Sequence, residues 1–333
     1  MKPPADVLEA LHGNDAGAAG AAPASRLHAL RARRQSLADA ALLLVTLIWG
    51  ATFVMVKDAV SVFPVFSFMT LRFSLAALAL APLVIWQSRH STGVLSKLES
   101  AESLQRTSRG GIARSLLPSA VIGLALFTGY AFQTAGLQLT TPAKAGFITG
   151  LSVAIVPVVS ALLLRHSPPR NAWLGVGLAT LGLALLSLTV DFRIRPGDLL
   201  VFGCAIAYAA HILLLGHHAP RHEPFKLTLG QVITVALCSG VAALIFDQRV
   251  ALTGQVVFAA AFTGILATAA AFGVQTIAQR FTTTTHTALI FSAEPVFAGL
   301  FSLLLIGELL GPRQLLGCAL ILAGMLVAEL RRR

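Results

Sequence analysis

Ten apolar runs of roughly 20 residues each dominate this chain of 333 residues. A helix rises about 1.5 Å per residue, so such a run can cross the roughly 30 Å hydrocarbon core of a bilayer. The runs predict an all-α polytopic membrane protein with ten transmembrane helices. They cover residues 39–58, 64–86, 115–138, 142–164, 171–190, 197–216, 225–246, 255–278, 284–306 and 312–330.

The composition excludes a water-soluble protein. Apolar residues make up 56% of the chain and charged residues 12%, against about 25% in soluble domains. The net charge is +11, but the basic residues are scattered in short segments between the apolar runs. That placement favours loops facing anionic lipid over a nucleic-acid groove. The three cysteines lie inside apolar runs without disulfide or metal-site spacing.

The distribution of Lys and Arg predicts the orientation in the membrane. Ten spans leave both termini on one side, and the segments on that side hold 18 Lys and Arg, against 6 in the opposite segments. The more basic side faces the cytoplasm, so we expect a multi-pass inner-membrane protein with cytoplasmic termini. Residues 1–36 are rich in Gly, Ala and Pro and end in the basic stretch RLHALRARR. We expect them to form a disordered cytoplasmic tail.

The chain contains an internal repeat. Residues 132–148 align with residues 274–290 at a shift of 142 without a gap. Upstream, a shift of 159 applies, because the loop around residues 88–113 lengthens the first half. Equivalent pairs are Gln133 with Gln275, Gly175 with Gly317, Gly182 with Gly324, Asp39 with Asp198, and Trp49 with Tyr208.

The repeat predicts two domains, residues 37–190 and residues 196–330, with five spans each. Because five is odd, the second repeat is inverted relative to the first. Inverted repeats are typical of secondary transporters, in which two related halves give alternating access. The alternative is a duplication that builds only a scaffold.

Several stretches resemble the EamA-type family of the drug/metabolite transporter superfamily. They include LIWGATFVMVK, FQTAGLQLTTPAKAGFITGLSVAIVP and SAEPVFAGLFSLLLIGE, and the resemblance extends from Leu37 to Leu330. It implies a ten-helix bundle with a central cavity that moves small metabolites such as amino acids. One departure is that Gly307-Glu308 ends the ninth run, whereas Arg165 and His166 stand at the equivalent positions of the first repeat.

Glu294 is the acid that most needs an explanation. It lies about ten residues into the ninth run, roughly 15 Å along a helix and near the membrane midplane. An ionised carboxylate is strongly disfavoured there unless it is paired or faces water, so Glu294 is our candidate for proton coupling. Pro295 frees the carbonyl of Phe291, so the pair marks a weak point in the helix. A structural acid and a packing kink are the alternatives.

Arg72 is the cation within the second run, about 12 Å from its start at Pro64. A cavity position would let it bind a substrate carboxylate through two hydrogen bonds. The alternative is a fixed bridge to Glu294. The full set of candidate substrate-binding residues is Trp49, Arg72, Tyr130, Gln133, Lys144, Tyr208, His211 and Gln275.

Other polar and small residues have simpler interpretations. Lys144 and His286 occupy equivalent positions, as a gate or as interfacial side chains. The threonines at positions 140–141 and 282–285 are expected to cap helices. The paired glycines allow close helix contact, which includes the option of a dimer surface. The loop HHAPRHE at residues 217–223 lacks standard metal spacing, so we expect no metal and no cofactor.

The predicted function is a secondary transporter of small organic metabolites, with amino-acid export preferred and proton coupling as a further hypothesis. Its partners are the bilayer and a small-molecule substrate, without nucleic acid, and a homodimer is left open. The alternative is a polytopic membrane enzyme acting on a lipid or isoprenoid, although such enzymes cluster their acids at one membrane face. A channel would need a continuous polar line.

Overall fold

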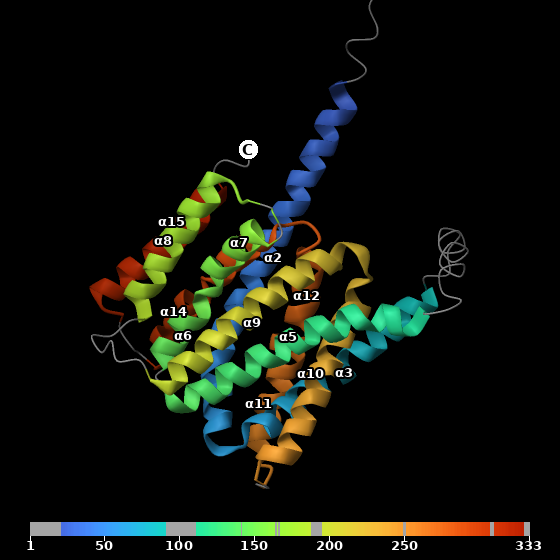
Figure 1. The fold of residues 1–333 in the computed structure, drawn as a ribbon, viewed down its shortest axis with the longest axis vertical. Coiled ribbons are helices and arrows are strands. Elements are labelled where there is room, and N and C mark those ends of the chain that lie inside the picture. Colours follow the sequence, from blue (N-terminus) through green and yellow to red (C-terminus); the bar gives the residue numbers. More distant parts are fainter. Residues whose placement is uncertain are drawn as a thin grey trace, which may run out of the picture.

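The computed structural model describes residues 21–90, 111–140, 142–163, 165, 167–187, 195–248, 251–306 and 310–329. All regular structure in this part of the chain is helical, which confirms the all-α prediction (Figure 1). The helices are α2 (Ala21–Val62), α3 (Val65–His90), α5 (Gly111–Leu139), α6 (Pro142–Gly150), α7 (Ser152–Leu162), α8 (Arg170–Ser187), α9 (Pro196–His218), the 3₁₀ turn η1 (Ala219–Arg221), α10 (Pro224–Phe246), α11 (Gly254–Gly264), the π-helix η2 (Ile265–Ala270), α12 (Ala271–Ala278), α13 (Thr284–Phe291), α14 (Glu294–Ile306) and α15 (Pro312–Glu329).

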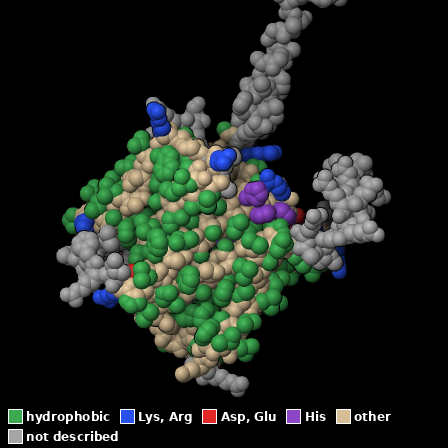
Figure 2. Space-filling view, viewed as in Figure 1, with side chains coloured by type: hydrophobic (Ala, Val, Ile, Leu, Met, Phe, Trp, Pro, Cys, Tyr) green, Lys and Arg blue, Asp and Glu red, His purple; other side chains and the backbone are tan. Residues whose placement is uncertain are grey.

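The helices have the length and surface of a polytopic membrane protein. Among the described residues, seven helical spans are long and apolar enough to cross a bilayer, and α8 and α15 are shorter apolar helices. Hydrophobic side chains cover most of the face in Figure 2, while Lys, Arg and His side chains lie toward its edges. An apolar exterior of this extent suits contact with lipid chains. The number of ten spans stays a prediction.

Helix α2 begins earlier than its sequence predicts. Its 42 residues start at Ala21, so residues 21–36 are helical rather than a disordered tail, and residues 1–20 lie outside the described part. At about 1.5 Å per residue the helix is roughly 63 Å long, and Figure 1 shows it extending past the bundle. The second repeat starts its corresponding helix at Pro196, whereas Leu37 stands at the equivalent position and does not break the helix.

Two of the predicted runs are interrupted at equivalent positions. The run at residues 142–164 breaks at Leu151, between α6 and α7, and the run at 284–306 breaks at Ser292–Ala293, between α13 and α14. Short-range bonds tighten both turns, from Leu151 N–H to the Ile148 carbonyl and from Ala293 N–H to the Ile290 carbonyl, each 3.1 Å. The expected weak point before Pro295 is therefore present, but the break in the first repeat was not expected.

The helices bury two main apolar cores. One joins α3, α5, α10 and α12 and includes Phe73, Leu126, Val235 and Phe272. The other joins α7, α8, α13 and α15. Each core therefore contains side chains from both halves of the chain.

The paired glycines hold α8 against α15 within one chain. A Cβ added to Gly175 would lie 2.6 Å from the carbonyl oxygen of Gly324, and one added to Gly182 would lie 2.6 Å from that of Gly317. The low-numbered glycine of α8 meets the high-numbered glycine of α15, so the two helices run antiparallel. The glycines thus serve an intramolecular contact, and these faces are not available for a dimer surface.

Candidate functional site

Arg72 is buried in the middle of the helix bundle although it carries a charge. It lies in α3 and is 5% exposed. Its Nε donates a hydrogen bond to Oγ1 of Thr268 at 2.8 Å, and its Nη2 donates to the hydroxyl of Tyr130 at 3.4 Å. The guanidinium carbon also lies 5.3 Å from the centre of the Tyr130 ring. Two N–H groups of Arg72 are therefore already hydrogen-bonded. Among the described residues, however, no carboxylate forms an ion pair with its guanidinium group.

A chain of ring contacts and hydrogen bonds continues from Tyr130 across α5, α9 and α6. The rings of Tyr130 and Tyr208 pack edge to face with centres 5.7 Å apart. The Tyr208 hydroxyl donates to Oε1 of Gln133 at 3.2 Å, and Nε2 of Gln133 donates to Oγ1 of Thr149 at 3.5 Å. Thr149 in turn lies 3.9 Å from the sulfur of Cys204. These groups line one partly buried surface of aromatic rings, amide and hydroxyl groups.

Glu294, in the same half of the chain as Tyr208 and Cys204, lies near this region. It is the first residue of α14, directly after the helix break, and it is partly buried. Its carboxyl lies within electrostatic reach of Tyr130, Tyr208 and Cys204. Among the described residues it has no hydrogen-bond or ion-pair partner. The fixed bridge to Arg72 considered from the sequence is absent, because Arg72 bonds to Thr268 and Tyr130 instead.

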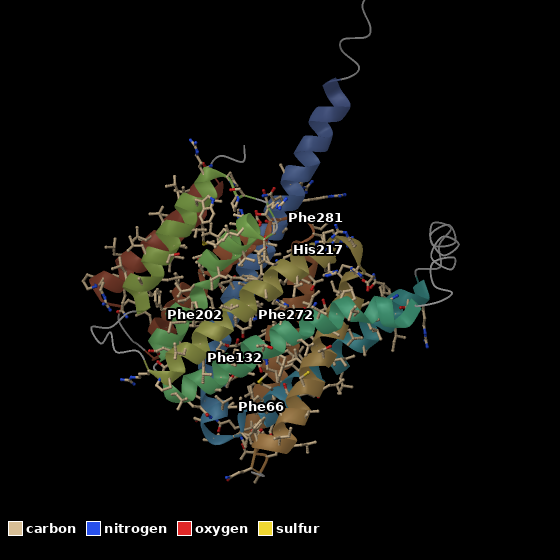
Figure 3. The ribbon with its side chains drawn as sticks, viewed as in Figure 1. Phe66, Phe132, Phe202, His217, Phe272 and Phe281 are labelled. Atoms are coloured by element: carbon tan, nitrogen blue, oxygen red, sulfur yellow. The ribbon has the colours of Figure 1, made fainter. Side chains whose placement is uncertain are left out.

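Trp49 connects this region to the π-helix. Its indole N–H donates to the carbonyl oxygen of Ala267 at 2.8 Å. The indole packs against Phe272 and Phe291, with ring centres 5.5 and 5.0 Å away. Figure 3 places Phe272 near the middle of the bundle. A π-helix segment within an α-helix often marks a functional site, and here Trp49 and Arg72 both bond to it.

His211 and Gln275 belong to a separate and more deeply buried cluster. His211 Nε2 lies 2.9 Å from Oε1 of Gln231. Gln275 Nε2 donates to Oε1 of Gln279 at 3.4 Å, and Gln279 Nε2 donates to the Ile212 carbonyl at 3.3 Å. The Oε1 atom of Gln275 is buried without a partner in the described part of the chain. The structure therefore divides the predicted site residues between two clusters.

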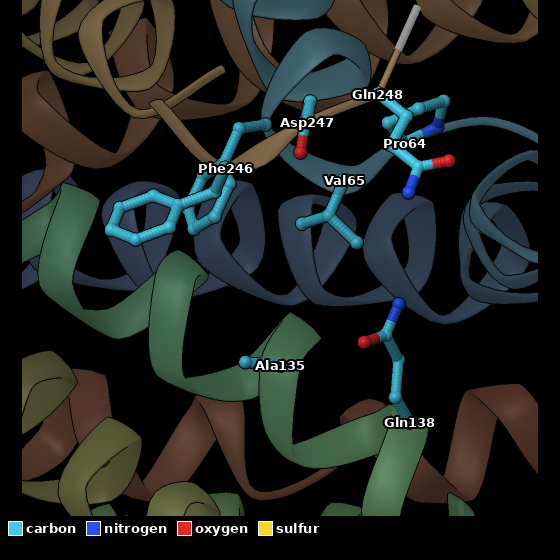
Figure 4. A pocket seen from close by; sticks show the side chains of 8 residues that line it. Pro64, Val65, Ala135, Gln138, Phe246, Asp247 and Gln248 are labelled. Atoms are coloured by element: carbon cyan, nitrogen blue, oxygen red, sulfur yellow. The ribbon is translucent and has the colours of Figure 1, made fainter. Parts of the chain in front are cut away.

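A cavity of about 400 Å³ opens at the end of the bundle where α3 begins and α10 ends. Figure 4 shows Gln138 on one side and Pro64, Val65 and Gln248 on the other. The Asp247 carboxylate in its wall accepts the backbone N–H of Ser67 at 2.6 Å. Helix α3 leads from this cavity to Arg72, about 10 Å further along its axis.

The remaining residues singled out from the sequence lie outside these two clusters or outside the described part of the chain. The side chain of Lys144 lies outside the described residues. The histidines at positions 217, 218 and 222 pack against each other in ring contacts. In the described ranges, side chains do not gather into a group that could hold a metal ion. Thr283 caps α13 by accepting the N–H of His286, as expected for one of the threonines.

Four residues in these clusters were not predicted from the sequence. They are Thr149, Thr268, Gln231 and Gln279. The repeat contains a signal for one of them, because the shift of 159 places Gln231 at the position of Arg72. Leu137 stands at the repeat position of Gln279, so the repeat offers no signal there.

Comparisons with known proteins agree with one another. The model of the EamA-like transporter family matches the chain twice, at residues 36–188 and 195–329. An uncharacterized transporter of Archaeoglobus fulgidus is 32% identical over 294 residues, which is 88% of this chain and 86% of the relative. The uncharacterized transporter YwfM of Bacillus subtilis is 26% identical over 201 residues, which cover 57% of this chain and 67% of YwfM.

A solved crystal structure has the same fold. It superposes with a TM-score of 0.72 at 20% sequence identity, covering 88% of this chain and 98% of the solved chain.

Proposed function

Because the chain belongs to the EamA-like transporter family, within the drug/metabolite transporter superfamily, we propose that it moves a small zwitterionic metabolite such as an amino acid across the membrane by alternating access. The observation that carries the proposal is the placement of Arg72 and Glu294. Arg72 donates a hydrogen bond to Tyr130, and the Glu294 carboxyl lies within electrostatic range of both Tyr130 and Tyr208. Arg72 and Glu294 do not contact each other directly. A solute with one positive and one negative end would satisfy both.

The repeat relationship supports this division of charge. At the position of Arg72 the second repeat has the neutral Gln231, and at the position of Glu294 the first repeat has Ser152. Each half thus supplies one charge of opposite sign. Arg72 is suited to a carboxylate because its planar fork of donors matches the carboxylate oxygens. Glu294 is suited to an ammonium group.

An inverted arrangement of ten helices in two repeats is part of the proposal. The glycine contacts between α8 and α15 support it. Replacing each residue of the contact Gly175–Gly324 by its repeat equivalent gives the other contact, Gly182–Gly317. The two helix breaks also fall at equivalent residues, and the family model matches once in each half. Discontinuous helices at corresponding positions of two inverted repeats are a mark of substrate sites in secondary transporters.

Proton coupling is proposed through Glu294. A carboxyl at membrane depth without a protein partner is costly when charged, so loading it with a proton or with a cationic group lowers that cost. We propose that the protein is an exporter in the inner membrane. We also propose that both termini are cytoplasmic, because the segments on the side of the termini hold the excess of Lys and Arg. The dispersed acids give no support to the alternative of a lipid-modifying enzyme.

The test uses purified protein in proteoliposomes, with transient charge movement or radiolabelled exchange as the readout. The panel contains amino acids, their methyl esters, their N-acetyl derivatives, and nucleosides. We expect a response to a free amino acid that falls at least tenfold for both the ester and the N-acetyl derivative, since each loses one charge. An equal response to all three forms would overturn the zwitterion proposal, and a response to nucleosides alone would redirect it to another solute class.

A further inference from the structure

Two polar contacts join the halves of the chain at opposite ends of the candidate site. At one end, the Thr140 hydroxyl, just after α5, donates to Oδ1 of Asp198 in the first turn of α9. At the other end, Asp39 of α2 lies 3.6 Å from Nε2 of His286 in α13. All four side chains are largely shielded from solvent, with Thr140 and Asp198 each 8% exposed and the side chains of Asp39 and His286 15% and 8% exposed.

The two contacts occupy equivalent places in the repeats. The shift of 159 carries Asp39 onto Asp198, and the shift of 142 carries Thr140 onto Thr282, four residues before His286. Each contact joins an acid of one repeat to the other repeat near the start of its fourth run, Thr140 just before that run and His286 in its first turn.

The contacts also flank the candidate site evenly. Asp39 and Trp49 are ten residues apart in α2, and Asp198 and Tyr208 are ten residues apart in α9. Ten helical residues correspond to about 15 Å. The site residues Trp49 and Tyr208 therefore lie about three turns inward from the two contacts.

We propose that the contacts Asp39–His286 and Asp198–Thr140 form the two gates of the transporter, which we call the gate latches. Each contact holds its own end of the site closed while the other end is open. The proposal rests on the proposed alternating access and assigns it four positioning residues. Opening an end separates the repeats at that end, and the separation has to break the contact there. Hydrogen bonds and ion pairs at charged groups are strong enough to bias such an equilibrium about tenfold.

The two latches differ in chemistry. Asp198 also accepts the N–H of Arg195 at 2.9 Å, so it caps its own helix while it binds Thr140. Asp39 lies inside the long helix α2, where the backbone amides around it are already bonded within the helix. Its carboxylate therefore interacts with the imidazole of the other repeat rather than with a helix end.

A native cysteine reports on opening from either side. Cys204 is fully buried and lies beside Thr149 in the candidate site, six residues along α9 from Asp198. Replacing Cys238 and Cys318 with Ala leaves it as the single cysteine of the chain. Its rate of labelling by a membrane-impermeant maleimide is measured in right-side-out and in inside-out membrane vesicles. The readout needs no transported solute, so it stands even if the proposed solute class is wrong.

Thr140→Val is expected to raise the labelling rate of Cys204 about tenfold from one side only. Asp39→Asn and His286→Gln are expected to raise it by a similar factor from the opposite side only. The matched controls are Thr253→Val, which removes a hydroxyl that caps α11, and Glu223→Gln, which alters the cap of α10. Neither control residue joins the repeats, so both should leave the labelling of Cys204 unchanged from either side.

A second arm does not depend on weakening the fold. A disulfide between Thr140→Cys and Asp198→Cys should abolish labelling of Cys204 from the side that Thr140→Val exposes, and reductant should restore it. The proposal is overturned if the variants at both ends change labelling from the same side, if neither end changes it, or if the disulfide leaves access from that side intact.

Discussion

Trp49 and Ala267 are joined by a hydrogen bond of 2.8 Å from the indole N–H to the backbone carbonyl oxygen. The acceptor lies within the π-helix Ile265–Ala270, and the donor lies at the repeat position of Tyr208. The bond ties α2 of the first half to an irregular segment of the second half. Arg72 ties α3 to the same segment through Thr268.

Trp49→Phe should destabilise the protein by about 1–3 kcal/mol, because the buried carbonyl of Ala267 loses its donor while the ring packing is largely kept. The measurement is the midpoint of thermal unfolding in detergent, followed by size-exclusion chromatography. Trp173→Phe is the control, since Trp173 is 37% exposed. Equal midpoints for the two variants would contradict the role assigned to the bond.

Arg72→Lys should lower the transport rate for an amino acid at least tenfold. Lysine keeps the charge but lacks the planar fork by which Arg72 bonds to Thr268 and Tyr130 at the same time. Uptake in proteoliposomes and solute binding by calorimetry measure the change. Thr268→Ser keeps a hydroxyl at the same place and should retain most of the activity. A fully active lysine variant would mean that only the charge matters.

Glu294→Gln should separate exchange from accumulation. The amide keeps the shape of the side chain but cannot take up or release a proton and no longer offers a charge to the ammonium group, so we expect gradient-driven accumulation to be lost while solute-for-solute exchange continues only at higher solute concentration. The two modes are measured in the same vesicles with and without an imposed proton gradient. Full gradient-driven accumulation in the variant would remove Glu294 from the coupling.

Gly182→Ala should loosen the contact between α8 and α15 and cost about 1–3 kcal/mol of stability. The added Cβ would lie 2.6 Å from the Gly317 carbonyl oxygen and 2.8 Å from the backbone nitrogen of Ile321, neither of which can turn away. Gly177→Ala is the matched control on the same helix, because a Cβ there meets no atom within 4 Å. Thermal unfolding should separate the two variants. Equal midpoints would refute the close packing.

The sequence predicted those features that depend on local chemistry. Apolar runs identify the membrane helices, and Pro295 locates the break before Glu294, because a proline cannot donate the backbone bond that the helix needs. The matching break at Leu151 escaped prediction, since Val153 stands where the second repeat has Pro295. Both α6 and α7 pack against α9, and such packing is not visible in the sequence of the segment itself.

The sequence singles out the candidate residues but not the contacts between them. Arg72 and Glu294 were notable because each is a charge inside an apolar run, but the sequence does not say whether they touch. The structure keeps them apart by giving Arg72 the hydroxyl groups of Thr268 and Tyr130, two residues from other helices. His211 similarly has its partner, Gln231, on a different helix, and only the assembled bundle brings them together.

Both apolar cores draw their side chains from both halves of the chain. A half chain alone would leave Phe73 and Leu126, or Leu289 and Ile321, without the surfaces that cover them. A half-length chain could therefore be stable only when a second half-length chain covers these surfaces. For the same reason, the two halves expressed as separate polypeptides should find each other and assemble into the complete bundle.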